Sequence, residues 1–279
     1  MAPPPSPVQD FVRAARQFAR SWTRAWNLSG RWLPAGWFDA LRQLALFGGA
    51  YYLYRIVRGI VDGQTGLAFE NARAVVDAER GLHLFFEPSL QSWAREHLDA
   101  IVWVANWMYV NSHFVVTTTF LIWLYVARNH AYYFVRNMFM IAMGLGLVGY
   151  AAFPTAPPRF LPEWGFADTV ASFVGESAEN SANVLYNPFA AMPSMHVAFA
   201  LMIAVPAIML VRHRALKLAW GVYPALVTFV VLVTANHFWL DAAVGAVVAV
   251  VSAVAAAAAL ARARPEAWAW RRAAAEAAR

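Results

Sequence analysis

The chain of 279 residues contains no cysteine and few charged side chains. Without cysteine it can have no disulfide, no thiolate nucleophile and no thiolate metal ligand. Only 14% of its residues are charged and 61% are hydrophobic, whereas soluble domains have about 25% charged and about 45–50% apolar residues. The composition therefore excludes an ordinary soluble domain and predicts an integral membrane protein.

The positive charge of the chain lacks the clustering that is typical of nucleic-acid binding. The formal net charge is +6, but the basic residues are interleaved with apolar stretches and form no single basic face. We therefore expect the membrane bilayer, and no nucleic acid, as a partner. Almost every basic residue is arginine and alanine is abundant, a composition typical of a GC-rich bacterial genome.

Six apolar stretches have about the 20 residues that a helix needs to cross a bilayer. The expected spans are 40–61, 99–127, 133–153, 195–211, 216–236 and 239–261. The predicted fold class is an all-α integral membrane protein, a bundle of six transmembrane helices. Residues 40–264 form the expected membrane domain, with a segment 1–39 before it and a cytoplasmic tail, 265–279, after it.

Residues 1–39 contain no continuous apolar region of the kind found in a cleavable signal peptide. Apolar residues recur instead at steps of three and four between Phe11 and Trp26, with arginines on another face. This pattern predicts a basic amphipathic helix in the membrane interface, facing anionic lipid. Docking of the same helix on a soluble partner is the alternative.

The segments that join the spans differ in their content of Lys and Arg. Most of these residues lie in segments 1–42, 128–136, 211–217 and 262–279, and few lie in 62–98 and 154–194. Because cytoplasmic segments are enriched in Lys and Arg, we expect both termini in the cytoplasm and a multi-pass protein of the bacterial plasma (inner) membrane. In the first outer loop, residues 66–98 predict an amphipathic helix along the outer surface, broken at Pro88.

Three polar sequences lie at the outer ends of the predicted spans: residues 153–159 (FPTAPPR), 192–196 (MPSMH) and 236–241 (NHFWLD). In the third, His237 and Asp241 are four residues apart and share one face if the segment is helical. A carboxylate in that position fixes the imidazole tautomer and makes the free ring nitrogen a better nucleophile. A His–Asp pair that only packs helices together is the alternative.

His196 and Arg159 are the other candidates for phosphate chemistry. Pro193 and Ser194 suit the start of a helix with Ser194 as its cap, and the first turn then offers N–H groups to an anion. His196 in that turn can protonate a leaving oxygen, and Arg159 is suited to bidentate phosphate binding. The alternatives are an interfacial histidine bonded to water and an arginine that extends to the membrane surface.

The sequences PSMH and NHFWLD resemble the second and third motifs of the type 2 phosphatidic acid phosphatase (PAP2) superfamily. Together with FPTAPPR, they look most like its inositol phosphorylceramide synthase-like branch, over residues 95–250 or so. The resemblance implies that His237 attacks phosphorus to form a phosphohistidine, oriented by Asp241, and that His196 is the general acid and base. It also implies phosphate binding by Arg159, Ser194 and Asn236, with no cofactor and no metal.

The chain departs from the family motifs at four positions. Ala152 and Phe160 stand where the first motif has Lys and Pro, and Val230-Val231 stands where the third has Ser-Arg. Two phosphate-binding cations are therefore missing, which fits the transferase-like branch better than a general phosphatase. Extension to the membrane surface is the favoured explanation of Arg55 and Arg58, and replacement of the missing cations in the pocket is the alternative. His113 is a candidate for the pocket lining or for a bond to a neighbouring helix.

These features together predict a membrane lipid phosphotransferase or phosphatase. It moves a phosphoryl group or phospho-headgroup from a lipid phosphate or phospholipid donor to water or to the hydroxyl of a polyol or lipid alcohol, at the outer membrane surface. A catalytically inactive lipid carrier or assembly factor built on the same bundle is the alternative. A small-solute transporter lacks support because the sequence shows no inverted repeat.

Overall fold

The computed structural model describes residues 33–60, 65–174 and 189–260, together with Arg16, Gln17, Ser21 and Gly30; the side chains of 57–60 and 259–260 are outside this description. Within these ranges the chain is helical and contains no β-strand, as predicted, apart from an isolated bridge between Thr155 and Ala190. Most of the expected amphipathic segment 1–39 and the whole tail 265–279 lie outside the described residues.

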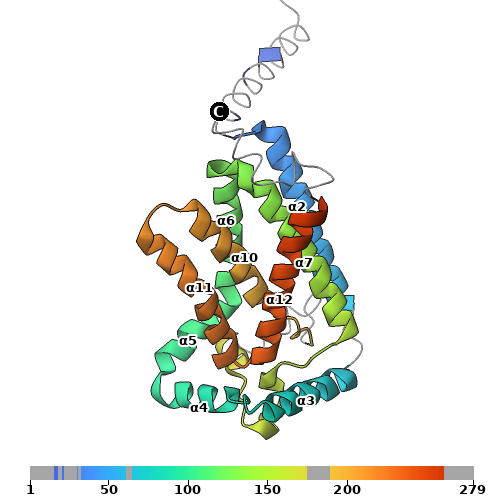
Figure 1. Ribbon diagram of the computed structural model, residues 1–279, viewed down its shortest axis with the longest axis vertical. Helices are drawn as coiled ribbons and strands as arrows, with labels where there is room; N and C mark the ends of the chain where they lie inside the picture. Colours follow the sequence, from blue (N-terminus) through green and yellow to red (C-terminus); the bar gives the residue numbers. More distant parts are fainter. Residues whose placement is uncertain are drawn as a thin grey trace, which may run out of the picture.

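The helices form a bundle whose long members run roughly side by side (Figure 1). They are α2 (Gly36–Ile60), α5 (Asp99–Trp107) with η1 (Met108–Ser112) and α6 (His113–Ala127), α7 (Asn129–Ala152), α10 (Met195–Leu210), α11 (Arg214–Val233) and α12 (Trp239–Ala255) with η5 (Ala256–Leu260). The sequence places the third span four residues too late, since α7 already begins at Asn129.

Four of the described helices are long and apolar enough to cross a membrane: Asp99–Ala127, Asn129–Ala152, Arg214–Val233 and Trp239–Ala258. The chain is therefore a helical membrane protein. The other two predicted spans correspond to α2, which carries charged residues near both ends, and to α10, which has only 16 residues. At about 1.5 Å per residue, α10 is shorter than the hydrocarbon core of a bilayer, about 30 Å.

Helix α10 lies at the centre of the bundle, in contact with α6, α7, α11 and α12. Ten of its residues are buried, and they occupy every side of the helix. A helix surrounded in this way must be apolar all round, which explains why its sequence, from Met195 to Leu210, contains one polar residue, His196. The position of that histidine is consequently fixed by the packing of four neighbouring helices.

The segment 193–195, at the start of α10, is enclosed by glycines of two neighbouring helices. A methyl group on Gly149 of α7 would lie 2.5 Å from Cδ of Pro193, and one on Gly146 would lie 2.9 Å from Sδ of Met195. On α12, a methyl group on Gly245 would overlap the carbonyl oxygen of Ser194. These glycines allow three backbones to approach closely, as small residues do in membrane bundles.

Two amphipathic helices, α3 (Thr65–Gly81) and α4 (Glu87–His97), lie across the end of the bundle where α7 ends and α12 begins (Figure 1). The buried face of α3 packs against Ala156, Leu161 and Phe166 and against Phe238. The sequence correctly predicts helices here but places the break wrongly, because Pro88 lies in the first turn of α4, where proline is tolerated. The chain turns earlier, at His83, whose φ is 58°.

Gly149→Ala should lower the thermal unfolding midpoint of the purified protein, because the added methyl meets the rigid ring of Pro193 and such overpacking costs about 1–3 kcal/mol. Gly144→Ala is the matched control on the same helix, since nothing lies within 4 Å of its added methyl. That control should leave the midpoint unchanged or slightly raised. Unfolding is followed by tryptophan fluorescence in detergent. Equal midpoints for the two variants would contradict the close packing around Pro193.

Candidate active site

Backbone hydrogen bonds join the three polar sequences at one end of the bundle. Arg159 N–H donates to the carbonyl of Ala235 (2.8 Å), and Ser194 N–H donates to the carbonyl of Asp241 (2.9 Å). Thr155 bonds in the same way to Phe189 and Ala191, just before the second polar sequence. The sequence prediction that these segments share one side of the bundle agrees with this arrangement.

His237 and Asp241 lie in contact, but not on a shared helix face. Helix α12 begins at Trp239, so His237 belongs to the preceding turn, in which Ala235 has a positive φ of 51°. The condition of a shared helix is therefore not met, as the predicted span 239–261 already implies, whereas the contact is present: Nδ1 of His237 lies 3.4 Å from Oδ2 of Asp241. That oxygen also accepts the Phe238 N–H at 2.9 Å, which holds the carboxylate in place.

His196 faces His237 from the first turn of α10. The centroids of the two imidazole rings are 5.7 Å apart, and the His237 and Asp241 side chains are almost fully buried, at 5% and 0% exposure. Ser194 precedes this turn in the cap position but forms no capping hydrogen bond with its side chain. Its hydroxyl is buried and, among the described residues, has no hydrogen-bond partner, so the expected side-chain cap is not formed.

Two further side chains contact His196 from the second predicted span. The ring centroid of His113 lies 4.6 Å and that of Tyr109 4.7 Å from that of His196. Both come from the region of η1, a single π-helical turn, an irregularity common at functional sites. The candidate role of His113 beside the site thus has a geometric basis, and Tyr109 is a neighbour that the sequence reasoning missed.

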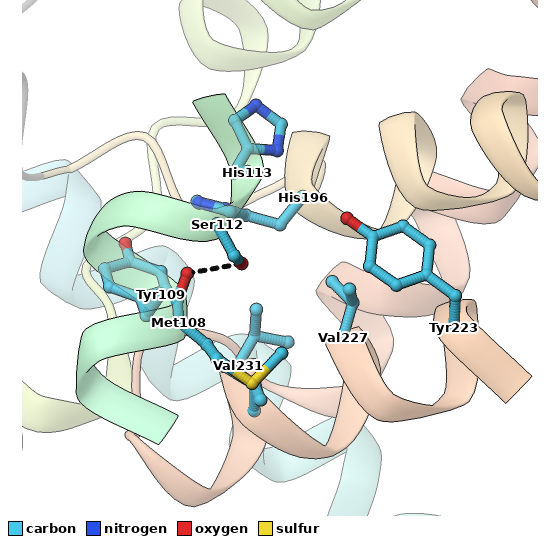
Figure 2. A pocket seen from close by; sticks show the side chains of 9 residues that line it. Met108, Tyr109, Ser112, His113, His196, Tyr223, Val227 and Val231 are labelled. Atoms are coloured by element: carbon cyan, nitrogen blue, oxygen red, sulfur yellow. Dashed lines mark hydrogen bonds between the residues drawn. The ribbon is translucent and has the colours of Figure 1, made fainter. Parts of the chain in front are cut away.

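A small cavity adjoins His196 between α11 and the η1 region. In the view of Figure 2, Tyr109 and Tyr223 lie on opposite sides of it, with His113 and His196 between them. Ser112 and four apolar side chains complete its wall: Met108, Val227, Val230 and Val231. The residues at the position of the missing Ser-Arg pair therefore make this wall apolar.

Arg159 is buried and ion-paired, so it does not extend to the membrane surface. It lies in a 3₁₀ turn, Pro158–Phe160, where its Nη1 contacts Asp168 at 3.0 Å (Oδ2) and 3.2 Å (Oδ1). Its guanidinium also lies over the ring of Phe160, 4.5 Å from the centroid. The sequence reasoning missed Asp168, although a carboxylate nine residues from the arginine in one outer loop was a visible signal.

The remaining predicted residues, Asn236, Arg55 and Arg58, form no described side-chain contact with the two histidines. The amide of Asn236 donates to the hydroxyl and carbonyl oxygens of Thr234, at 2.8 and 3.2 Å, and thereby stabilises the turn before His237. Its role in binding phosphate stays a prediction. Arg55 is half-buried on α2, and the side chain of Arg58 lies outside the described residues.

Comparison with known proteins identifies one family. The family model described as the PAP2 superfamily matches residues 73–255, a range that begins within α3 and includes every histidine of the site. No curated protein and no solved structure matches the chain.

Asp168→Asn should make the protein's stability sensitive to inorganic phosphate. Removing the partner of a buried charge is destabilising, by about 1–3 kcal/mol here because the Asp168 side chain is 25% exposed. Millimolar phosphate can then replace the carboxylate on Arg159 and raise the unfolding midpoint more than it does for the native protein. Glu163→Gln, at an exposed carboxylate of the same loop, is the control. An equal phosphate response in all three proteins would argue against anion binding at Arg159.

Proposed function

The chain belongs to the PAP2 superfamily, since the family model matches more than half of its residues, and on this premise we propose that it is a lipid phosphotransferase or phosphatase that works through a phosphohistidine at His237. Members of the superfamily are typically phosphatases, and membership suggests a lipid substrate that bears phosphate. The chemical role of each residue below is part of the proposal.

The position of His237 between Asp241 and His196 is the observation that carries the proposal. Nδ1 of His237 lies 3.4 Å from the Asp241 carboxylate, in contact but without a hydrogen bond. We assign the ring proton to that nitrogen, so that Nε2 keeps a lone pair with which to attack phosphorus. His196 then donates a proton to the departing oxygen. In the second step His196 takes a proton from the acceptor hydroxyl, which attacks phosphorus and releases His237.

Two groups neutralise the charge on the phosphoryl oxygens. The first is the N-terminal turn of α10, whose N–H groups have no carbonyl partner within the helix and attract anions. The second is Arg159, which binds the substrate when phosphate replaces Asp168 as its partner. Such electrostatic stabilisation is a large part of the catalysis of phosphoryl transfer. No metal ion is needed for these steps.

The membrane setting supports a lipid donor. Large apolar side chains are exposed along α6, α11 and α12, including Ile122, Val222 and Val250, as expected of a surface in contact with acyl chains. We propose six spans, with α2 and α10 as the other two, both termini in the cytoplasm and the site facing outward. A lipid headgroup at the outer surface then reaches the end of the bundle where the histidines lie.

We place transfer to a hydroxyl acceptor ahead of hydrolysis, as in the inositol phosphorylceramide synthase-like branch. Val230 and Val231 stand at the position of the Ser-Arg pair, beside His196, and the lack of that arginine is what supports this order. The Arg159–Asp168 ion pair favours the other candidate, an inactive lipid carrier. In such a carrier Arg159 would stabilise the fold through Asp168 and would bind no phosphate.

An assay of label transfer separates these functions. Purified protein in mixed micelles with EDTA is given phosphorus-labelled phospholipids, with or without a polyol or a long-chain alcohol. We expect label in a new product only when the alcohol is present. Free labelled phosphate regardless of alcohol would identify a phosphatase, and no release of label from any donor would favour the carrier.

His237→Ala should abolish both turnover and covalent labelling, whereas His196→Ala should trap the phosphoenzyme. With an alkyl phosphate ester that releases nitrophenolate, the first step needs no general acid, but the second step still needs His196 as base. Acid-labile, base-stable label should therefore accumulate at least tenfold over native protein in His196→Ala. His213→Ala, at an exposed histidine before α11, should behave as the native protein does. Covalent label retained in His237→Ala would overturn the assigned nucleophile.

A further inference from the structure

The first three N–H groups at the start of α12 bind three different carboxyl groups. Phe238 N–H donates to Asp241 within the same turn (2.9 Å). Trp239 N–H donates to Oε1 of Glu87 at 2.9 Å, and Leu240 N–H donates to Oε1 of Glu79 at 3.2 Å. The two glutamates come from α4 and α3, so both outer helices are bonded to the turn that carries the catalytic aspartate.

Both glutamates are fully buried, which is unusual for charged residues. Their exposure is 0%, like that of Asp241, and an unpaired carboxylate in such a place costs several kcal/mol. Burial and the nearby charges of Glu87 and Asp241 raise the pKa of Glu79 to about 9. At neutral pH Glu79 is therefore protonated, and one negative charge is removed from a group of three carboxyls.

We propose that Glu79 and Glu87 are positioning residues, which keep the Asp241 carboxylate directed at His237 by occupying the other N–H groups of the α12 start. The competing arrangement is clear from the structure. Oδ1 of Asp241 is buried and, within the described residues, has no hydrogen-bond partner. Without the glutamates, Trp239 and Leu240 would offer two donors to that oxygen, and the carboxylate could rotate away from Nδ1 of His237.

The same two bonds direct the anion of the substrate to α10. The start of α12 is a second helix N-terminus beside the site and would by itself attract phosphate. With its N–H groups occupied by carboxyl groups, it offers none to an anion. The inference rests on the proposed function, since it assigns Glu79 and Glu87 a role in aligning the nucleophile of that reaction.

The charged surroundings of Glu79 determine how the site depends on pH. Glu87 faces it from α4, and Asp241 faces it from α12 with His237 alongside. Residues 156–168 also pack on α3, and the charged groups of that segment are Arg159 and Asp168, which pair with each other, and the exposed Glu163. Ionisation of Glu79 near pH 9 adds one negative charge beside the carboxyl groups of Glu87 and Asp241, which weakens the start of α12.

The pKa of Glu79 is raised above its unfolded value of 4.5, so the folded state binds more protons than the unfolded state between pH 4.5 and about 9. Stability contributed by this group therefore falls as the pH rises through that window. Glu79→Gln keeps the acceptor for Leu240 and cannot ionise. It should retain activity at pH 7 within about twofold and lose the decline in activity near pH 9.

Glu79→Ala tests the alignment itself, with Asp77→Asn, at an exposed position of the same helix, as the control. We expect kcat to fall at least tenfold with KM changed less than threefold, because the nucleophile is misaligned while the substrate still binds. The second readout is acylation of His237 by diethyl pyrocarbonate, followed by peptide mass spectrometry and referred to the exposed His213. Its rate should fall about tenfold in Glu79→Ala and stay unchanged in Glu79→Gln and Asp77→Asn.

These readouts distinguish the possible failures. If Glu79→Ala lowers the unfolding midpoint but leaves the acylation of His237 unchanged, the glutamate only caps the helix and the inference is overturned. Retention of the alkaline decline by Glu79→Gln overturns it too. If native protein forms no phosphoenzyme, the proposed function fails, whereas the acylation rates still test the alignment of His237. If Glu79→Ala does not fold, Glu79→Gln carries the test through its pH profile.

Discussion

The hydrogen bond from Ser194 N–H to the carbonyl of Asp241 is the interaction on which the rest of the site depends. It joins the beginning of α10, which carries His196, to the beginning of α12, next to His237. Because Ser194 and Asp241 are both fully buried, these backbone groups have no water to bond if the contact breaks. The absence of a side chain at Gly245 makes the contact sterically possible, so this glycine allows the starts of α10 and α12 to approach closely.

The sequence predicts the composition of the site better than its contacts. The three polar sequences each mark a helix end at the same end of the bundle, so their meeting could be inferred from the predicted alternation of the spans. The contacts of Arg159 with Asp168, and of Glu87 and Glu79 with α12, could not. The two glutamates lie 152 and 161 residues from their partners, and no local pattern indicates which buried donor a distant carboxylate will reach.

The local differences between the predicted and the observed elements lie where a turn leads into a helix. A spacing of four residues brings two side chains together on a helix, but it does the same where a turn leads into a cap, as with His237 and Asp241. The positive φ of Ala235 is not signalled by glycine or asparagine, the residues that usually adopt it. Likewise Pro88 lies in the first turn of α4, whereas the long amphipathic pattern of residues 66–98 predicts a break of the helix at this proline.

The π-helical turn at Met108–Ser112 has a consequence for how this chain can change by deletion. Such a turn holds one residue more than regular α-helical geometry requires. Loss of a single residue there would give an ordinary helical turn and leave α5 and α6 facing almost the same way, because five residues at π-helical pitch turn through about the same angle as four at α-helical pitch. The side chains within the turn, Tyr109 among them, would shift relative to His196, whereas the flanking helices would keep their neighbours. A deletion in this turn would therefore change the surroundings of His196 and leave the rest of the bundle in place.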